Sequence, residues 1–226
     1  MGSAGWGLLT VDIDGTLTRG HGWKVIAETL GQRDAFARTN RRFFAREIGE
    51  DEHLRDMLSL AAGTPVAAIE RALAATPRLE GIVEGVARLQ AGGIRVALLS
   101  HNPPYVGEWY VRRFGFDAFA GTDGQPVVDG IVGPPGGIHA DKRAGLEALS
   151  RRLGVSPRRI VHAGDGWADA AIFPLVGGGI AINSRLPEVD WAADLVLRTD
   201  DFRSVATAVE RLPARVRPSA VLSEFL

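Results

Sequence analysis

The chain has 226 residues, with 26 basic and 27 acidic side chains and no cysteine. This length allows one sizeable core plus a smaller appended unit, the balanced charge speaks against a nucleic-acid partner or a membrane surface, and the lack of cysteine excludes disulfides and thiolate chemistry. No segment approaches the 18 apolar residues needed to span a bilayer and the start lacks a signal-peptide pattern, so we expect a cytoplasmic protein.

The apolar run over residues 8–11 ends at Asp12 and Asp14, which Gly15 and Thr16 follow. A continuous apolar run predicts a strand covered on both faces of a parallel sheet, and ligands of such sheets bind at the carboxyl ends of the strands. Three interpretations compete: a simple Asp-Gly turn, a calcium loop, or an aspartyl nucleophile with a neighbouring general acid. The calcium loop fits poorly because that loop needs a third ligand before its glycine, whereas here Gly15 follows Asp14 directly. The nucleophile needs partners elsewhere in the chain.

Residues 19–79 are polar and rich in helix patterns, which predicts a helical insert after the first strand. Apolar side chains at helical spacing indicate a first helix that ends at Gly31, a second over about residues 36–48 and a third that ends at Gly63. Thr64 is expected to cap a fourth helix, with Pro65 at its first position. An insert beside the reactive end of a strand is able to act as a lid that excludes water.

From Glu80 onward, helix and strand patterns alternate, which predicts a parallel α/β sheet. A helix with Val83, Val86 and Leu89 on one face is followed by a strand that ends at Ser100. Residues 119–132 are expected to form a hairpin or a looped excursion. The remaining expected elements are helices at 104–114, near 146–153 and at 202–212, strands at 159–163, 179–183 and 194–197, and a loop at 134–137. The resulting division is a core of residues 1–18 and 80–226 with the insert at 19–79.

Polar side chains fall at several expected strand ends or in a nearby helix: Asp12 with Asp14, Ser100, Lys142, and Asp165 with Asp169. Each has a plain structural explanation. Ser100 suits a helix N-cap, Lys142 a solvated surface and the Asp165–Gly166 pair a turn. Together, they supply what transfer of a phosphoryl group to a carboxylate requires, namely an attacking oxygen held in line and groups that neutralise charge.

These motifs, in this order, resemble the haloacid dehalogenase superfamily of phosphatases over nearly the whole chain. The pattern is Asp-x-Asp-Gly-Thr, a serine after an apolar strand, a lysine, and Gly-Asp-x-x-x-Asp. The insert and the Gly164–Asp169 segment are similar to the phosphoserine phosphatase branch. The resemblance implies a Rossmann-like, doubly wound parallel sheet core with a small inserted helical cap.

The resemblance also implies roles for these residues. Asp12 would form an aspartyl-phosphate, and Asp14 would protonate the leaving alcohol and then activate water. Magnesium would bind the carboxylates of Asp12 and Asp165 and the backbone carbonyl of Asp14. Asp169 would be a direct ligand, a ligand through water or an orienter of Lys142. The phosphoryl group would be held by Ser100, Lys142, Thr16 and the backbone near Gly15.

The chain departs from this branch at residues expected to contact the substrate. His21 and Met57 stand where the branch has a glutamate and an arginine for the amino and carboxyl groups of serine, and Ser100 is followed by His101 and Asn102 instead of two glycines. A leaving-group carboxylate would then lack its cation, so we expect a small soluble phosphomonoester as substrate and no selectivity for L-phosphoserine. Substitution by Arg55 or Arg46 stays open, as do a low-turnover regulatory module and an intramolecular phosphomutase. No oligomeric state is predicted.

Overall fold

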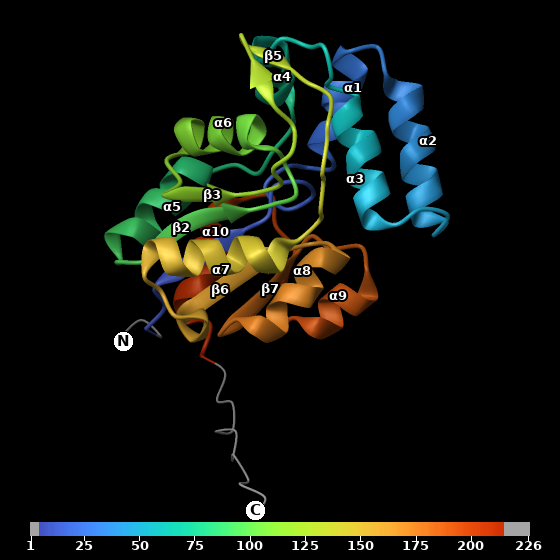
Figure 1. Cartoon of the computed structure of the whole chain (residues 1–226). Helices are drawn as coiled ribbons and strands as arrows, with labels where there is room; N and C mark the ends of the chain where they lie inside the picture. Colours follow the sequence, from blue (N-terminus) through green and yellow to red (C-terminus); the bar gives the residue numbers. More distant parts are fainter. Residues whose placement is uncertain (1–4, 215–226) are drawn as a thin grey trace, which may run out of the picture.

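A six-stranded parallel sheet forms the centre of the computed structural model, which describes residues 5–214 (Figure 1). Each neighbouring pair of strands runs parallel, and β1 lies between β2 and β6. The prediction of a doubly wound parallel sheet is confirmed. In spatial order the strands are β3 (Ala118–Ala120), β2 (Arg95–Leu99), β1 (Leu8–Val11), β6 (Ile160–Gly164), β7 (Gly178–Ile182) and β8 (Leu195–Leu197).

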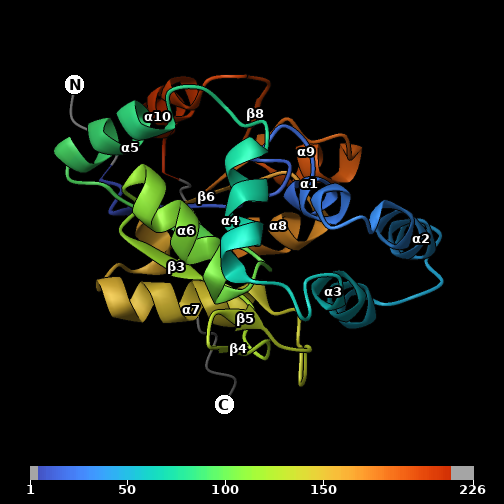
Figure 2. The ribbon, with the colours of Figure 1, turned by 90° about the horizontal axis from the view of Figure 1, so that it is seen from above.

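Helices cover both faces of this sheet because alternate strand residues point to opposite sides. Leu9 and Val11 of β1 belong to the larger apolar core, whereas Leu8 belongs to a second cluster with Leu146 and Leu149. The view from above shows α5, α6 and α10 on one side of the sheet and α7 on the other (Figure 2). The covering helices are α5 (Ile82–Ala91), α6 (Pro104–Phe114), α7 (Lys142–Leu153), α8 (Trp167–Ile172), α9 (Pro187–Ala192) and α10 (Phe202–Arg211), with short 3-10 turns at Pro157–Arg159 and Phe173–Leu175.

Four helices between β1 and α5 gather at one end of the molecule (Figure 1). Their buried side chains, including Trp23, Leu58 and Ile69, are continuous with the larger core. These helices therefore pack against the sheet layer instead of standing apart from it. They are α1 (Gly22–Thr29), α2 (Arg33–Phe44), α3 (Glu50–Ser59) and α4 (Val66–Ala75).

Two local predictions in the helices are wrong. Thr64 does not cap α4, whose N-cap is Pro65 and whose first helical residue is Val66. The backbone here is extended because it pairs with the hairpin: Val132 N donates to Thr64 O at 2.9 Å. In α5, Val83 is 52% exposed, and the buried face instead contains Ile82, Gly85, Val86 and Leu89.

The expected hairpin within residues 119–132 is present as β4 (Val127–Val128) and β5 (Ile131–Val132), joined at Asp129 and Gly130. The same stretch also begins with β3, an edge strand of the main sheet that sequence analysis missed. Three residues are too few for a visible apolar period. The short helices α8 and α9 escaped detection for the same reason.

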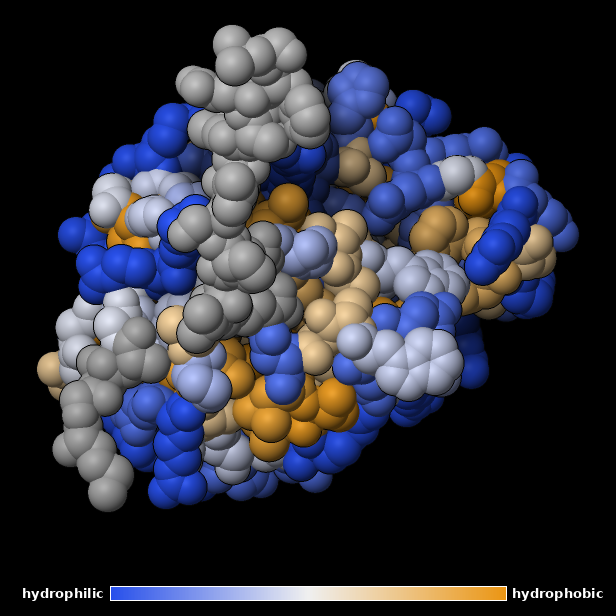
Figure 3. All heavy atoms as spheres, turned by 90° about the horizontal axis from the view of Figure 1, so that it is seen from below, coloured by the Kyte–Doolittle hydropathy of each residue, from blue (hydrophilic) through white to orange (hydrophobic). Residues whose placement is uncertain are grey.

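On the face seen from below, an apolar area lies among hydrophilic side chains (Figure 3). The view is from the side away from α1–α4. Trp191 on α9 is 83% exposed, the largest fraction among the large apolar side chains that the structure describes.

Within residues 5–214, no helix is both long enough and apolar enough to cross a membrane.

Candidate active site

Asp12 and Asp14 follow β1 directly, at the carboxyl edge of the sheet. Asp12 N donates to Ala163 O of the neighbouring strand at 2.9 Å, which extends the pairing one residue beyond β1. Asp12 is 5% exposed. Gly15 has a φ of +85°, and a Cβ added there would lie 2.2 Å from Asp165 Oδ2. Glycine is therefore required both by the backbone and by the approach of a second strand-end carboxylate.

Lys142 begins α7 and reaches into this edge, where it is 8% exposed. Its Nζ lies 2.7 Å from Asp12 Oδ1 and 2.6 Å from Asp169 Oδ1. Asp141 caps the helix by accepting from Ala144 N at 2.9 Å, which fixes the helix start. Burial opposes the charged ammonium, but the two carboxylates outweigh burial and raise the pKa of Lys142. The solvated-surface interpretation of Lys142 is wrong.

Both carboxylate oxygens of Asp169 are occupied by donors. Oδ1 contacts Lys142 Nζ and His162 Nε2, the latter at 2.9 Å. Oδ2 accepts from the backbone N–H groups of Asp165 at 3.1 Å and Gly166 at 3.0 Å. Burial acts to raise the pKa of Asp169, but Lys142 and His162 outweigh it, and the pKa lies well below its usual range. Asp169 is therefore a buried carboxylate that stays charged.

Three carboxylates converge at this edge. One oxygen each of Asp12, Asp165 and Asp169 lies within 4.8 Å of the others. Burial and the charge of Asp169 raise the pKa of Asp12 to about 7, against the lowering effect of Lys142. Burial, together with Asp12 and Asp169, raises the pKa of Asp165 to about 8. Thr16 Oγ1 donates to Asp165 Oδ1 at 2.7 Å. Crowded oxygen ligands of this kind fit a hard divalent cation, whose charge would relieve their repulsion.

Asp14 is oriented by a chain of hydrogen bonds that runs across the site. Trp23 Nε1 donates to Asn102 Oδ1 at 2.8 Å, and Asn102 Nδ2 donates to Asp14 Oδ2 at 2.8 Å and to Ser100 Oγ at 3.0 Å. Asp14 Oδ1 accepts from Gly22 N at 2.5 Å. The N-cap interpretation of Ser100 is wrong, since Pro103 occupies that position of α6. Ser100 and Asn102 instead lie beside the carboxylate of Asp14.

The N-terminus of α3 contacts two core loops that carry site residues. Glu50 Oε1 lies 3.4 Å from Nδ1 of His101, the neighbour of Ser100. Asp51 Oδ1 accepts from Ala140 N at 2.7 Å, two residues before Lys142. His139 is exposed and pairs with Asp51 at 3.4 Å. The α2–α3 hairpin is thereby held against the carboxyl edge of the sheet.

The remaining predicted site residues also lie on this side of the sheet. His21 Nδ1 is 3.5 Å from Asp14 Oδ1. Met57 of α3 is 2% exposed and contacts Asn40 Nδ2 through Sδ at 4.0 Å. Arg46 and Arg55 are exposed, and their charges act on Glu188 and Asp51 respectively.

A family model for haloacid dehalogenase-like hydrolases matches residues 9–173, more than half of the chain. The match spans Asp12, Asp14, Asp165 and Asp169. The chain belongs to the haloacid dehalogenase-like hydrolase family. The resemblance inferred from the motifs is confirmed.

Several relatives of this hydrolase carry the name phosphoserine phosphatase. The one from Archaeoglobus fulgidus is 29% identical over 213 residues, which cover 93% of this chain and 61% of the relative. The one from Haemophilus influenzae is 25% identical, with 88% and 64% covered. The chain therefore spans about three fifths of the length of these two relatives. A shorter relative from Halobacterium salinarum is 26% identical, with 86% of this chain and 93% of the relative covered.

Solved structures of similar fold include a hydrolase of this family from Salmonella enterica serovar Typhi, with a TM-score of 0.80 and 18% identity. The match covers 90% of this chain and 71% of that chain. A substrate-bound phosphoserine phosphatase gives a TM-score of 0.74 at 22% identity, with 89% and 97% covered. At these identities the similarity establishes the fold.

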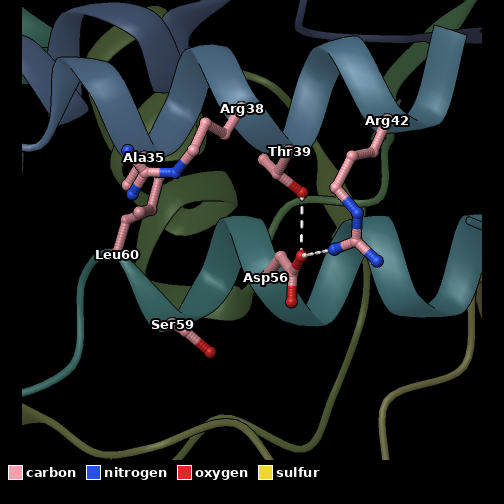
Figure 4. Close-up of a pocket in the computed structure, with 7 residues that line it drawn as sticks. All are labelled: Ala35, Arg38, Thr39, Arg42, Asp56, Ser59 and Leu60. Carbon is pink, nitrogen blue, oxygen red and sulfur yellow. Dashed lines mark hydrogen bonds and ion pairs between the residues drawn. The ribbon is translucent and has the colours of Figure 1, made fainter. Parts of the chain in front are cut away.

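A pocket between α2 and α3 is lined by none of Asp12, Asp14, Asp165 and Asp169. In Figure 4, Thr39 and Arg42 on α2 point toward Asp56 on α3. Asp56 Oδ2 accepts from Thr39 Oγ1 at 3.0 Å and from Arg42 Nη1 at 3.4 Å. These polar groups form hydrogen bonds with one another, so we interpret them as contacts that hold α2 and α3 together.

Sequence analysis missed His162 and Thr10, which lie behind the site. Both are fully buried and face each other across paired strands, with Thr10 Oγ1 2.9 Å from His162 Nδ1. The sequence feature that could have indicated them is a polar residue inside each of two otherwise apolar strand patterns. The hydrogen bond from Trp23 to Asn102 was not predicted from the sequence either.

Proposed function

We propose that this hydrolase is a magnesium-dependent phosphomonoesterase that acts on a small phosphorylated metabolite through an aspartyl-phosphate. The observation that carries this proposal is the buried bridge of Lys142 between Asp12 and Asp169, with a second carboxylate, Asp14, held close by. The names of the relatives support the same reaction class. A cytoplasmic location stays a prediction.

Asp12 is the proposed nucleophile. Its carboxylate oxygen attacks phosphorus, and the bond between phosphorus and the leaving oxygen breaks. Lys142 holds Oδ1 of Asp12 and counters the negative charge of the transferred group. Asp14, oriented by Asn102, gives its proton to the leaving alkoxide. Asp14 then takes a proton from water, which attacks phosphorus and releases phosphate and the free carboxylate of Asp12.

The carboxylates of Asp12 and Asp165 and the backbone carbonyl of Asp14 are the proposed magnesium ligands. A bound Mg²⁺ would neutralise charge on the phosphoryl oxygens. The four hydrogen bonds that Asp169 accepts leave its oxygens occupied. We therefore assign Asp169 the role of orienting Lys142 and the Asp165–Gly166 backbone.

Phosphate recognition is assigned to Ser100, Lys142, Thr16, His101, Asn102 and the backbone of Gly15. The insert of residues 19–79 is the proposed cap over the core formed by residues 1–18 and 80–226. Two cap residues, His21 and Met57, contribute to the choice of leaving alcohol. Neither provides a fixed cation, and Arg46 and Arg55 act on other carboxylates. We therefore propose that L-phosphoserine is not the preferred substrate.

The test is hydrolysis of 4-nitrophenyl phosphate by the purified protein with and without Mg²⁺. We expect magnesium-dependent phosphate release that is lost in Asp12→Asn. Equal turnover by wild type and Asp12→Asn would overturn the proposal. Binding of phosphate analogues without hydrolysis across a broad panel would indicate a regulatory module, and an isomeric phosphate product would indicate a mutase.

A further inference from the structure

One face of α3 begins at Glu50 beside the loop that follows Ser100, so we expect the leaving alcohol to lie next to the first turn of this helix. Glu50, His53 and Met57 are spaced i, i+3 and i+7, so they lie on the same face of the helix. Glu50 pairs with His101 beside Ser100. His53 Nε2 lies 3.2 Å from Asn40 Oδ1, and the amide of the same Asn40 contacts Met57. This face therefore combines a carboxylate, an imidazole and a thioether.

The imidazoles of His53 and His101 carry no charge at neutral pH. Burial lowers the pKa of His53 to about 4, and the charge of nearby His21 acts in the same direction. Burial also lowers the pKa of His101 to about 4, with Lys142 adding to the effect. Neither histidine is able to serve as the cation for a substrate carboxylate at pH 7.

Fixed cations are also missing from this face. Within residues 5–214, no hydrogen bond or ion pair of Glu50, His53 or Met57 involves an arginine or lysine. Lys142 acts on Glu50 through space, but its ammonium is already bound by Asp12 and Asp169. A leaving-group carboxylate placed here would meet the carboxylate of Glu50 without a compensating partner.

Two polar groups are left with bonding capacity. His101 Nε2 is buried and has no hydrogen-bond partner among the described residues. The contact of Glu50 is a 3.4 Å pair with a neutral imidazole, and its side chain remains 46% exposed. A buried polar atom without a partner is uncommon in folded proteins. Both groups suit a ligand that brings hydroxyl or ammonium groups.

We infer that Glu50 is a specificity-determining residue, which selects phosphomonoesters whose alcohol carries a hydroxyl or ammonium group and no carboxylate. This inference rests on the proposed phosphatase function and narrows its substrate class. The hydrogen-bond donor of the alcohol binds the carboxylate of Glu50, with His101 beside it. A carboxylate on the alcohol is repelled by the same group.

The experiment compares two pairs of substrates. Within each pair, one member carries a carboxylate, and in the other member a hydrogen or a hydroxymethyl group takes its place. O-phosphoethanolamine is matched with O-phospho-L-serine, and glycerol 3-phosphate with 3-phosphoglycerate. In the wild type, kcat/KM should favour the carboxylate-free member of each pair by about tenfold or more, since a like-charge contact at about 4 Å costs at least about 1 kcal/mol even in water. Glu50→Gln should reduce both ratios, mainly by lowering KM for the carboxylate-bearing member.

Glu52→Gln is the matched control, because Glu52 lies on the same turn of α3 but pairs with Arg42 at 2.9 Å. It should leave both ratios unchanged. A wild-type preference for the carboxylate-bearing substrates, or ratios that Glu50→Gln does not alter, would overturn the inference.

Failure of the proposed function has a different signature. It is the absence of turnover of 4-nitrophenyl phosphate, which carries no carboxylate. In that case, calorimetric binding of the same two pairs to the wild type still measures the selectivity, with equal affinities within each pair as the contradicting result.

Discussion

His162 Nε2 lies 2.9 Å from Asp169 Oδ1, the same oxygen that Lys142 contacts. Thr10 Oγ1 is 2.9 Å from the other ring nitrogen. Burial lowers the pKa of His162, so the ring is neutral and carries a single N–H. A hydroxyl that donates to Nδ1 leaves that N–H on Nε2, directed at Asp169. The two central strands thus supply a buried donor behind the lysine–carboxylate bridge.

Replacing His162 with leucine should weaken this arrangement. Asp169 would lose one of its four donors in a fully buried setting, at a cost of about 1–3 kcal/mol in the free energy of unfolding. The kcat for 4-nitrophenyl phosphate should fall while KM changes little, since Lys142 would be less well oriented. Urea denaturation and steady-state kinetics check both. His162→Gln, which keeps a donor, should be affected less; equal losses in the two variants would contradict the role assigned to the N–H.

Lys142→Met should lower the free energy of unfolding more than His162→Leu does, because it leaves Asp12 and Asp169 buried without their cation. Breaking a buried pair in this way costs about 3–5 kcal/mol of stability. Activity should be lost as well. Lys24→Met, at an exposed lysine of α1, serves as the control in the same denaturation assay. Adding Asp12→Asn to Lys142→Met should recover part of the stability, and strict additivity of the two losses would argue against the pairing.

The chain from Trp23 through Asn102 predicts a graded loss of turnover. Asn102→Ala removes the hydrogen bond from Nδ2 to Asp14 Oδ2, worth about 0.5–1.5 kcal/mol, so kcat should fall by about two- to tenfold. Trp23→Phe removes only the contact that orients the amide and should cost less. Kinetics with 4-nitrophenyl phosphate measure both. If Trp23→Phe lowers kcat as much as Asn102→Ala does, or more, then Trp23 does not act through the Asn102 amide.

Magnesium should stabilise the fold, because the pKa values of Asp12 and Asp165 are raised by burial and by neighbouring carboxylates. A ligand at one hundred times its Kd adds about 2.7 kcal/mol to the free energy of unfolding. Thermal melts with Mg²⁺ and with a chelator check this. Asp165→Asn should abolish the increase in Tm, whereas Asp123→Asn, in an exposed loop, should preserve it. An unchanged wild-type Tm would speak against a metal site here.

The contribution of His53 and His101 to stability should decrease as the pH falls from about 6.5 toward about 4, whereas the raised pKa values of Asp12 and Asp165 act in the opposite direction over the same range. The pKa values of His53 and His101 are lowered from 6.5 to about 4 in the folded chain, mainly by burial. Between these values the unfolded chain binds protons that the folded chain does not, so acid favours unfolding, and the full contribution is present above 6.5. Urea denaturation at a series of pH values measures the slope. Compared with the wild type, His53→Gln should gain less stability as the pH rises over this range, and a slope that the substitution leaves unchanged would contradict the assignment.

The sequence determined the order of the motifs and the class of fold. Apolar strands that end in Asp12, Ser100 and Asp165 predicted a parallel sheet with reactive groups at one edge, because all parallel strands present their carboxyl ends there. Long helices with a clear period, such as α6 and α7, were also predicted from the sequence. Short elements such as β3 and α8 were not, since a few residues carry no readable period.

Tertiary structure alone decided which groups touch. Lys142 and Asp12 are 130 residues apart, and nothing local in either segment shows that Nζ and Oδ1 meet at 2.7 Å. The pairing of Thr10 with His162, and of Glu50 with His101, depends likewise on strand register and on the position of α3. Local sequence patterns report burial and spacing within one element, whereas contacts between elements depend on how the whole chain packs. The sequence by itself therefore specified the chemical groups of the site, and packing specified their charge states and partners.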